Sequence, residues 1–153
     1  MVADIKIKAN TIQVSKYLQK LQRTIPKDIQ TALNKVSAYG VKQITDKTQK
    51  GKTPDGGTFQ GYAPSTKKNR SKRGRQVSFV DLTDTGQMFR SLTWKANRNK
   101  STLFFRRQSE NKKASYHDFF GAGKTKIVRP FFAIGRKDEN KIRDIFSKTI
   151  GVR

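Results

Sequence analysis

Residues 24–50 read TIPKDIQTALNKVSAYGVKQITDKTQK, and this stretch decides the fold. Its apolar and small positions recur at the spacing of one helix face, at Ile29, Leu33, Val36, Gly40 and Ile44. We expect Thr24 to cap this helix, with Pro26 in its first turn and Gly51 just after its end. At 1.5 Å per residue, such a helix would be about 40 Å long. It would be the main structural rod of the protein.

A second helical stripe precedes this rod, separated from it by Pro26. The stripe is formed by Val14, Tyr17, Leu18, Leu21 and Ile25. Further upstream, polar and apolar residues alternate over residues 5–8, which predicts a short strand at the start of the domain.

Downstream of the rod, residues 51–61 have the composition of a loop, GKTPDGGTFQG. We expect Phe59 and Tyr62 to pin this loop to the body of the protein. A strongly basic segment follows at about 63–77, with no large apolar side chain between Tyr62 and Val77. Because such a segment cannot bury enough surface to offset the entropy of ordering it, we predict a flexible basic loop. Its cations are Lys67, Lys68, Arg70, Lys72, Arg73 and Arg75.

The next segment predicts a short helix followed by a hairpin. Thr83 or Asp84 could cap the helix, whose inward side chains would be Met88, Phe89 and Leu92. Residues 93–97 and 102–107 then read as two strands joined by a turn.

The last part of the chain predicts another strand and a final helix. Residues 131–134 form an apolar run, and Asp138 and Glu139 are placed to open the helix. The apolar face of this helix consists of Ile142, Ile145, Phe146 and Ile150. The sequence thus predicts an α+β fold, in which a long N-terminal helix and a C-terminal helix pack on a small, mainly antiparallel β-sheet with long basic loops.

The composition indicates one basic domain and excludes several kinds of site. The 153 residues carry 34 Lys and Arg against 11 Asp and Glu, a formal charge of +23, and suit a single domain over 1–153. There is no Cys, so disulfides, thiol nucleophiles and thiolate metal sites are excluded. No apolar run approaches the ~20 residues of a membrane span and no signal peptide is evident, so we expect a soluble protein made in the cytosol.

No catalytic constellation emerges from the residues, and we predict no catalytic, cofactor or metal site. The single imidazole, His117, is expected to pack partly buried with its polar edge satisfied. Helix capping accounts for Asp81 with Asp84, and for Asp138 with Glu139.

Two apparent binding motifs also fail. Residues 121–125, GAGKT, match only the end of a phosphate-binding loop, since Asp118 stands where the motif needs Gly and Pro130 soon follows. Phe104 and Phe105, followed by two arginines, suggest a nucleic-acid stacking platform, but adjacent strand residues point to opposite faces.

The order of four short segments resembles a known family. The segments are GKTPDGGTFQGYAPSTK at 51–67, LTDTGQMFRSL at 82–92, YHDFFG at 116–121 and RPFF at 129–132. Over about Gly51 to Gly135 the chain resembles the neck and tail-completion proteins of tailed bacteriophages, the virion morphogenesis family. It departs from them at Phe59, where many relatives have Trp, and in the high charge of the basic segment.

The resemblance implies a structural virion protein rather than an enzyme. It would form a ring, sixfold as the resemblance suggests, at the head–tail junction, where it joins the connector or head-closure protein to the tail. The expected location is therefore the virion, after assembly in the host cytoplasm. We expect structural roles first for Thr85, Gly86, Arg129 and Pro130, and contact between subunits as the second interpretation. Contact between subunits is also considered for Phe59 and Tyr62.

The charge adds a hypothesis about assembly. Because like charges within a Debye length of ~8 to 10 Å repel, the free subunit should be monomeric or weakly associated, and should assemble on an acidic template. That template would be a neighbouring connector or tail ring, the DNA in the channel, or both. We expect the contact surface to include the six cations of the basic segment and, secondarily, Arg98, Lys100, Lys112 and Lys113.

The alternative from a different class is a general nucleic-acid-binding protein, such as a ribosome-associated or nucleoid factor. Its DNA affinity should fall steeply and linearly with salt on a log-log plot, without any dependence on virion partners.

Overall fold

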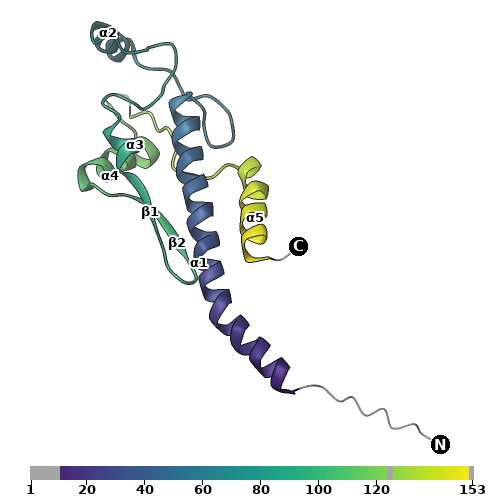
Figure 1. Ribbon diagram of the computed structural model, residues 1–153. Helices are drawn as coiled ribbons and strands as arrows, with labels where there is room; N and C mark the ends of the chain where they lie inside the picture. The colour runs from purple at the N-terminus through teal and green to yellow at the C-terminus, as the bar shows by residue number, and fades with distance from the viewer. Residues whose placement is uncertain (1–10, 124–125, 152–153) are drawn as a thin grey trace, which may run out of the picture.

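The computed structural model describes residues 11–123 and 126–151 (Figure 1). The strand expected at residues 5–8 lies outside these residues. The elements are α1 (Thr11–Gln49), α2 (Pro64–Lys72), α3 (Gln87–Ser91), β1 (Leu92–Ala96), β2 (Ser101–Phe105), α4 (Gln108–Ser115), a π-helical turn η1 (Tyr116–Phe120) and α5 (Arg136–Ile150). The α+β fold is confirmed, with a long N-terminal helix, a C-terminal helix and a two-stranded antiparallel sheet.

The first helix, α1, is one continuous element of 39 residues, and it contains Pro26. The expectation of two helices separated at Pro26, with Thr24 as a cap, is therefore wrong. The Thr24 hydroxyl instead donates to the carbonyl of Lys20, one turn back in the same helix. Proline removes one backbone donor from a helix, but water can satisfy the freed carbonyl where the helix is exposed. The predicted end of the rod is confirmed, because α1 stops two residues before Gly51.

Among the described residues, those outside α1 cover the second half of this helix only. Figure 1 shows the β1–β2 hairpin along one side of it and α5 along another, while the N-terminal half extends beyond both. Gly40 lies where this packing is closest, since a Cβ there would come within 3.3 Å of the Ile134 side chain and 3.5 Å of Leu103. The small residue lets the last apolar segment and β2 approach α1.

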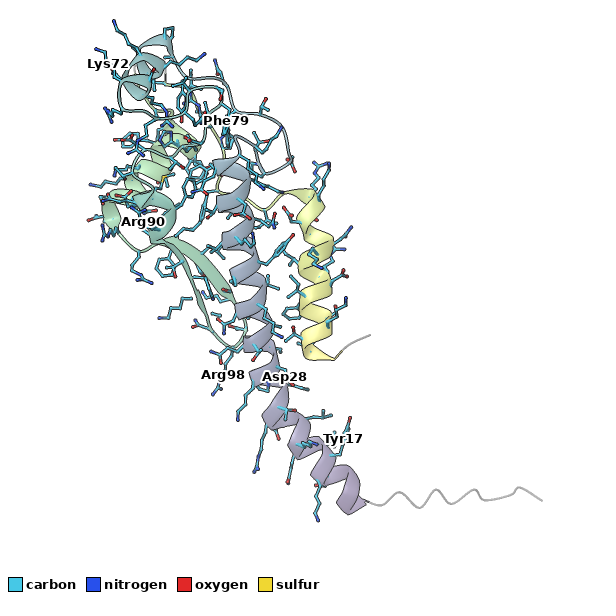
Figure 2. The ribbon with its side chains drawn as sticks, turned by 45° about the horizontal axis from the view of Figure 1, so that its top comes forward. Tyr17, Asp28, Lys72, Phe79, Arg90 and Arg98 are labelled. Carbon is cyan, nitrogen blue, oxygen red and sulfur yellow. The ribbon has the colours of Figure 1, made fainter. Side chains whose placement is uncertain are left out.

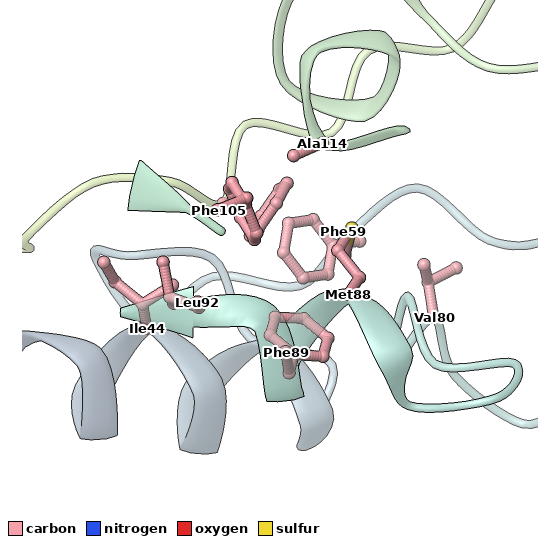
Figure 3. Close-up of a cluster of buried hydrophobic side chains, with 9 residues drawn as sticks. Ile44, Phe59, Val80, Met88, Phe89, Leu92, Phe105 and Ala114 are labelled. Carbon is pink, nitrogen blue, oxygen red and sulfur yellow. The ribbon is translucent and has the colours of Figure 1, made fainter. Parts of the chain in front are cut away.

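The hydrophobic core lies between the end of α1, the hairpin and the loops around them (Figure 3). Three phenylalanine rings meet there: Phe131 lies edge-on to Phe89, with ring centroids 5.9 Å apart, and 6.4 Å from Phe105. The prediction that Met88, Phe89 and Leu92 face inward is confirmed. The buried cluster is completed by Ile44, Phe59, Val80 and Ala114.

The predicted hairpin is confirmed, but the strand at residues 131–134 is not formed. Leu92 pairs with Phe105 and Ala96 with Ser101 in an antiparallel register. The backbone N–H groups of Phe131 and Phe132 donate to one carboxylate oxygen of Asp118, at 2.8 and 3.0 Å. Because a side chain takes these donors, this apolar segment lines the core without joining the sheet.

The C-terminal helix α5 is anchored to α1 through a buried carboxylate. Asp138 accepts hydrogen bonds from Lys47 and from the Tyr39 hydroxyl, and Lys47 also donates to the carbonyl of Pro54 at 2.8 Å. Capping was the expected role of Asp138, but its carboxylate instead joins two helices, and the carboxylate of Asp55 accepts the N–H of Arg136, the first residue of α5, at 3.2 Å. Within the described residues, no helix has both the length and the apolarity that a membrane span needs.

Candidate interaction surfaces

The basic segment predicted as a loop contains a helix, α2, which Figure 1 shows at the end of the molecule opposite the free half of α1. Arg70 is the one buried residue of α2, and it donates to both carboxylate oxygens of Asp81, at 3.0 and 3.2 Å. Its other guanidinium nitrogens donate to the carbonyls of Gln76 and Thr83. Arg70 was expected to face a partner. The structure instead places its side chain inside the protein, where it fixes α2 to the following loop.

Tyr62 completes this buried cluster. Its hydroxyl donates to Asp81 at 2.8 Å, and the Arg70 guanidinium lies over its ring, 4.6 Å from the centroid. Burial, followed by the hydrogen bond and charge of Asp81, raises the pKa of Tyr62 to about 12. Asp81, which capping was expected to explain, is therefore the shared acceptor of the cluster.

Arg129 fixes the loop on the other side of Tyr62. It is buried and donates to the carbonyls of Gln60 and Gly61, both at 3.1 Å. Burial lowers the pKa of Arg129 from its ordinary value. A structural role was the first expectation for Arg129, and these contacts are of that kind.

The remaining cations of the basic segment form two groups. Arg73 and Arg75 are exposed and lie beside the carboxylate of Asp84, at 3.2 and 4.0 Å. Lys67, Lys68 and Lys72 are exposed and form no ion pair within the described part of the chain (Figure 2 labels Lys72). The three lysines make the available positive face of α2.

The secondary cations do not extend this face. Arg98 and Lys100 are exposed in the turn between β1 and β2, near α1 and far along the molecule from α2 (Figure 2). Lys112 and Lys113 are exposed on α4, where Lys113 pairs with the buried carboxylate of Glu110 at 2.8 Å. The ten predicted cations therefore occupy separate places on the structure.

The other residues considered for subunit contact also differ in accessibility. Phe59 is buried in the core, whereas Thr85 and Pro130 are exposed. Gly86 has a φ of 74° and precedes α3 directly, so the predicted cap at Thr83 or Asp84 is wrong. A left-handed backbone at this point suits glycine and turns the chain into the helix.

His117 lies half-buried in η1, and its Nδ1 atom is buried without a hydrogen-bond partner in the described residues. The expectation that its polar edge is satisfied is wrong for this atom. Burial lowers the pKa of His117, and the positive charge of Arg129 lowers it further. In the described part of the chain, His, Asp and Glu form no group of three that could hold a metal ion.

Two exposed apolar surfaces add to the predicted candidates. The first, the free face of α1, has Tyr17, Leu18 and Ile25 exposed at 61%, 58% and 47%. The second, the η1 face, has Tyr116, Phe119 and Phe120 exposed at 57%, 68% and 67%. Helical spacing revealed the stripe on α1, but no sequence signal told which part of the stripe the core would leave uncovered.

Comparison with known proteins identifies the chain at the family level. No curated protein and no solved structure matches it significantly. The model of the phage virion morphogenesis family matches residues 9–151, which is nearly the whole chain. This match extends beyond the 51–135 region of the sequence resemblance and includes α1 and α5. The chain belongs to the phage virion morphogenesis family.

Proposed function

We propose that this chain is a subunit of a ring at the head–tail junction of a tailed bacteriophage, where it joins the connector to the tail. The family membership supports a structural role in the virion. The ring, its position and a count of about six copies go beyond the family and constitute the proposal. The proposed partners are copies of this chain, the connector or head-closure protein and the tail proteins, with the DNA of the channel as a further contact.

The observation that carries the proposal is the uncovered apolar face of α1. Leu18, Leu21 and Ile25 follow the same helix face that is covered by the body from Ala32 onward. A helix that keeps its apolar face beyond its own core needs a further partner to bury it. A neighbouring copy of the chain is the occupant that we propose.

A ring also requires two different surfaces on each subunit. Contacts between unlike patches of identical chains close into rings when the rotation allows, whereas a self-complementary patch gives a dimer. The free face of α1 and the η1 face are two unlike apolar patches on one chain. They lie on separate elements: in Figure 1 the N-terminal half of α1 extends beyond the hairpin and α5, whereas α4, which η1 follows directly in the chain, lies beside α3.

The test is complementation of a phage that lacks this gene, followed by electron microscopy of the particles. Leu18→Glu with Ile25→Glu should leave heads and tails unjoined, because carboxylates would be buried in the contact between copies. The matched control is Gln19→Glu with Gln30→Glu, which adds the same charge to exposed positions of α1 outside its apolar face. Joined particles in the absence of the gene would refute the proposed function, and equal defects in both variants would refute the role of the apolar face.

A further inference from the structure

Three arginines outside the ten predicted cations line one hollow of the surface. Arg90, Arg106 and Arg107 surround a space of about 320 Å³ together with Gln87 and Ser91. Arg90 comes from α3, and the other two come from the link between β2 and α4. Two separate segments thus place three arginines around one hollow, which Figure 2 locates by its Arg90 label.

The backbone positions of these arginines are fixed. The N–H of Arg106 donates to the carbonyl of Ser91 at 2.8 Å, which ties the link to the end of α3. The carbonyl of Arg107 accepts the N–H groups of Glu110 and Asn111, so Arg107 is held at the start of α4. The hollow therefore needs little ordering of the backbone before it can bind.

The Arg90 side chain is held as well. Its guanidinium donates to the carbonyl of Thr85 at 2.8 Å and lies so close to Gly86 that a Cβ there would be 3.1 Å from Nη1. Gly86 thus serves the left-handed turn and also leaves room for the guanidinium. Thr85 and Gly86, which belong to the segment 82–92 of the family resemblance, thus have a role in holding the Arg90 side chain.

No carboxylate of the described residues pairs with the arginines of this hollow. None of the three guanidinium groups forms an ion pair with a carboxylate in residues 11–123 and 126–151, in contrast to Arg70, Arg73 and Arg75. The positive charges of three arginines around one hollow repel one another, and an anion bound in the hollow would reduce that repulsion. Arginine forks also match the oxygen geometry of phosphate better than point charges do.

We propose that Arg90, Arg106 and Arg107 form a binding site for successive phosphate groups of the DNA backbone. A single carboxylate would balance one of the three charges, whereas successive phosphates of a strand supply negative charge repeatedly along the surface. This proposal rests on the proposed function, because the DNA would pass through the proposed ring. Binding by the isolated chain does not require the ring, so the two proposals can fail separately.

The first measurement is an NMR titration of the full chain with inorganic phosphate. The Nε–Hε signals of Arg90, Arg106 and Arg107 should shift together and saturate, while those of Arg143 should not. Shifts that are equal for all arginines would mean general screening and would overturn the site.

The second measurement is the salt dependence of binding to a short DNA duplex, followed by fluorescence anisotropy. Changing all three arginines to Gln should reduce the log-log slope by up to about 0.9 for each phosphate that the variant no longer binds. The matched control, Lys141→Gln with Arg143→Gln and Lys148→Gln, removes the same charge from exposed positions of α5 and should keep the parent slope. Equal reductions in the two variants would overturn the proposal. If polyglutamate displaced phosphate from the arginines and DNA did not, the proposal would likewise be overturned, in favour of an acidic protein partner.

Discussion

At the residue scale, the cations between Lys67 and Arg75 have different roles although the sequence presents them as one cluster. Arg70 should be essential to stability, because its removal leaves the buried Asp81 carboxylate without its cation. Arg70→Ala should lower the free energy of unfolding by about 3 kcal/mol or more. Lys68→Ala, on an exposed position of the same helix, should change it by no more than about 0.5 kcal/mol. Chemical denaturation followed by circular dichroism measures both, and similar stabilities for the two variants would contradict the anchoring role of Arg70.

His117 gives the molecule a pH dependence with a defined sign. Its pKa in the folded protein lies below the ordinary 6.5, so between these two values the unfolded chain binds more protons than the folded one. The free energy of unfolding should therefore increase as the pH rises toward 6.5 and level off above it. The slope from this residue cannot exceed about 1.4 kcal/mol per pH unit.

The single histidine makes this prediction easy to isolate. Denaturation between about pH 5 and pH 8 should show the increase in the parent protein and a smaller one in His117→Gln. An imidazole NMR signal that titrates at or above 6.5 in the folded chain would contradict the assignment.

The sequence could identify these side chains but not their partners. The Arg70 and Asp81 pair is eleven residues apart, across a helix end and a loop. No periodicity predicts such a contact, because it depends on the path of an irregular segment. The same reason explains why the hollow formed by Arg90, Arg106 and Arg107 was missed: it exists only after α3 and α4 are brought together.

At the element scale, the neighbouring acidic residues of α5 should have unequal effects. Asp138→Ala should reduce the free energy of unfolding by about 2 kcal/mol, because Lys47 and Tyr39 would lose their shared acceptor. Glu139→Ala is the matched control, since Glu139 lies in the same first turn but is exposed. Both residues interact with the helix dipole, so the difference between the variants measures the contact with α1. Equal destabilisation would mean that the dipole alone accounts for the effect.

Elements with regular periodicity were predictable, and those defined by single contacts were not. The end of α1, the hairpin and α5 followed from apolar spacing and turn residues. The segment at 131–134 has strand composition, yet Asp118 takes two of its N–H groups. The helix α2 was missed because it has almost no apolar face, and Arg70 supplies its buried contact instead.

At the scale of the whole molecule, charge and apolar surface act against each other. Each copy carries +23, which opposes association, while the free face of α1 and the η1 face favour it. Added salt shifts this balance toward association. The Debye length falls from ~10 Å at 0.1 M salt to ~3 Å at 1 M, so the repulsion between charges weakens while apolar contacts remain. Ionic strength should therefore control self-association of the purified chain.

Light scattering coupled to gel filtration tests this prediction. At low salt the chain should elute with the mass of one copy, 17.5 kDa, and the mass should increase as salt is added. Leu18→Glu with Ile25→Glu should abolish the increase, whereas Gln19→Glu with Gln30→Glu, which lowers the net charge equally, should retain it. An acidic partner such as duplex DNA or polyglutamate should promote association at low salt, because it neutralises the same repulsion. A closed ring that is stable at low salt without any partner would show that the charge does not hold the subunits apart.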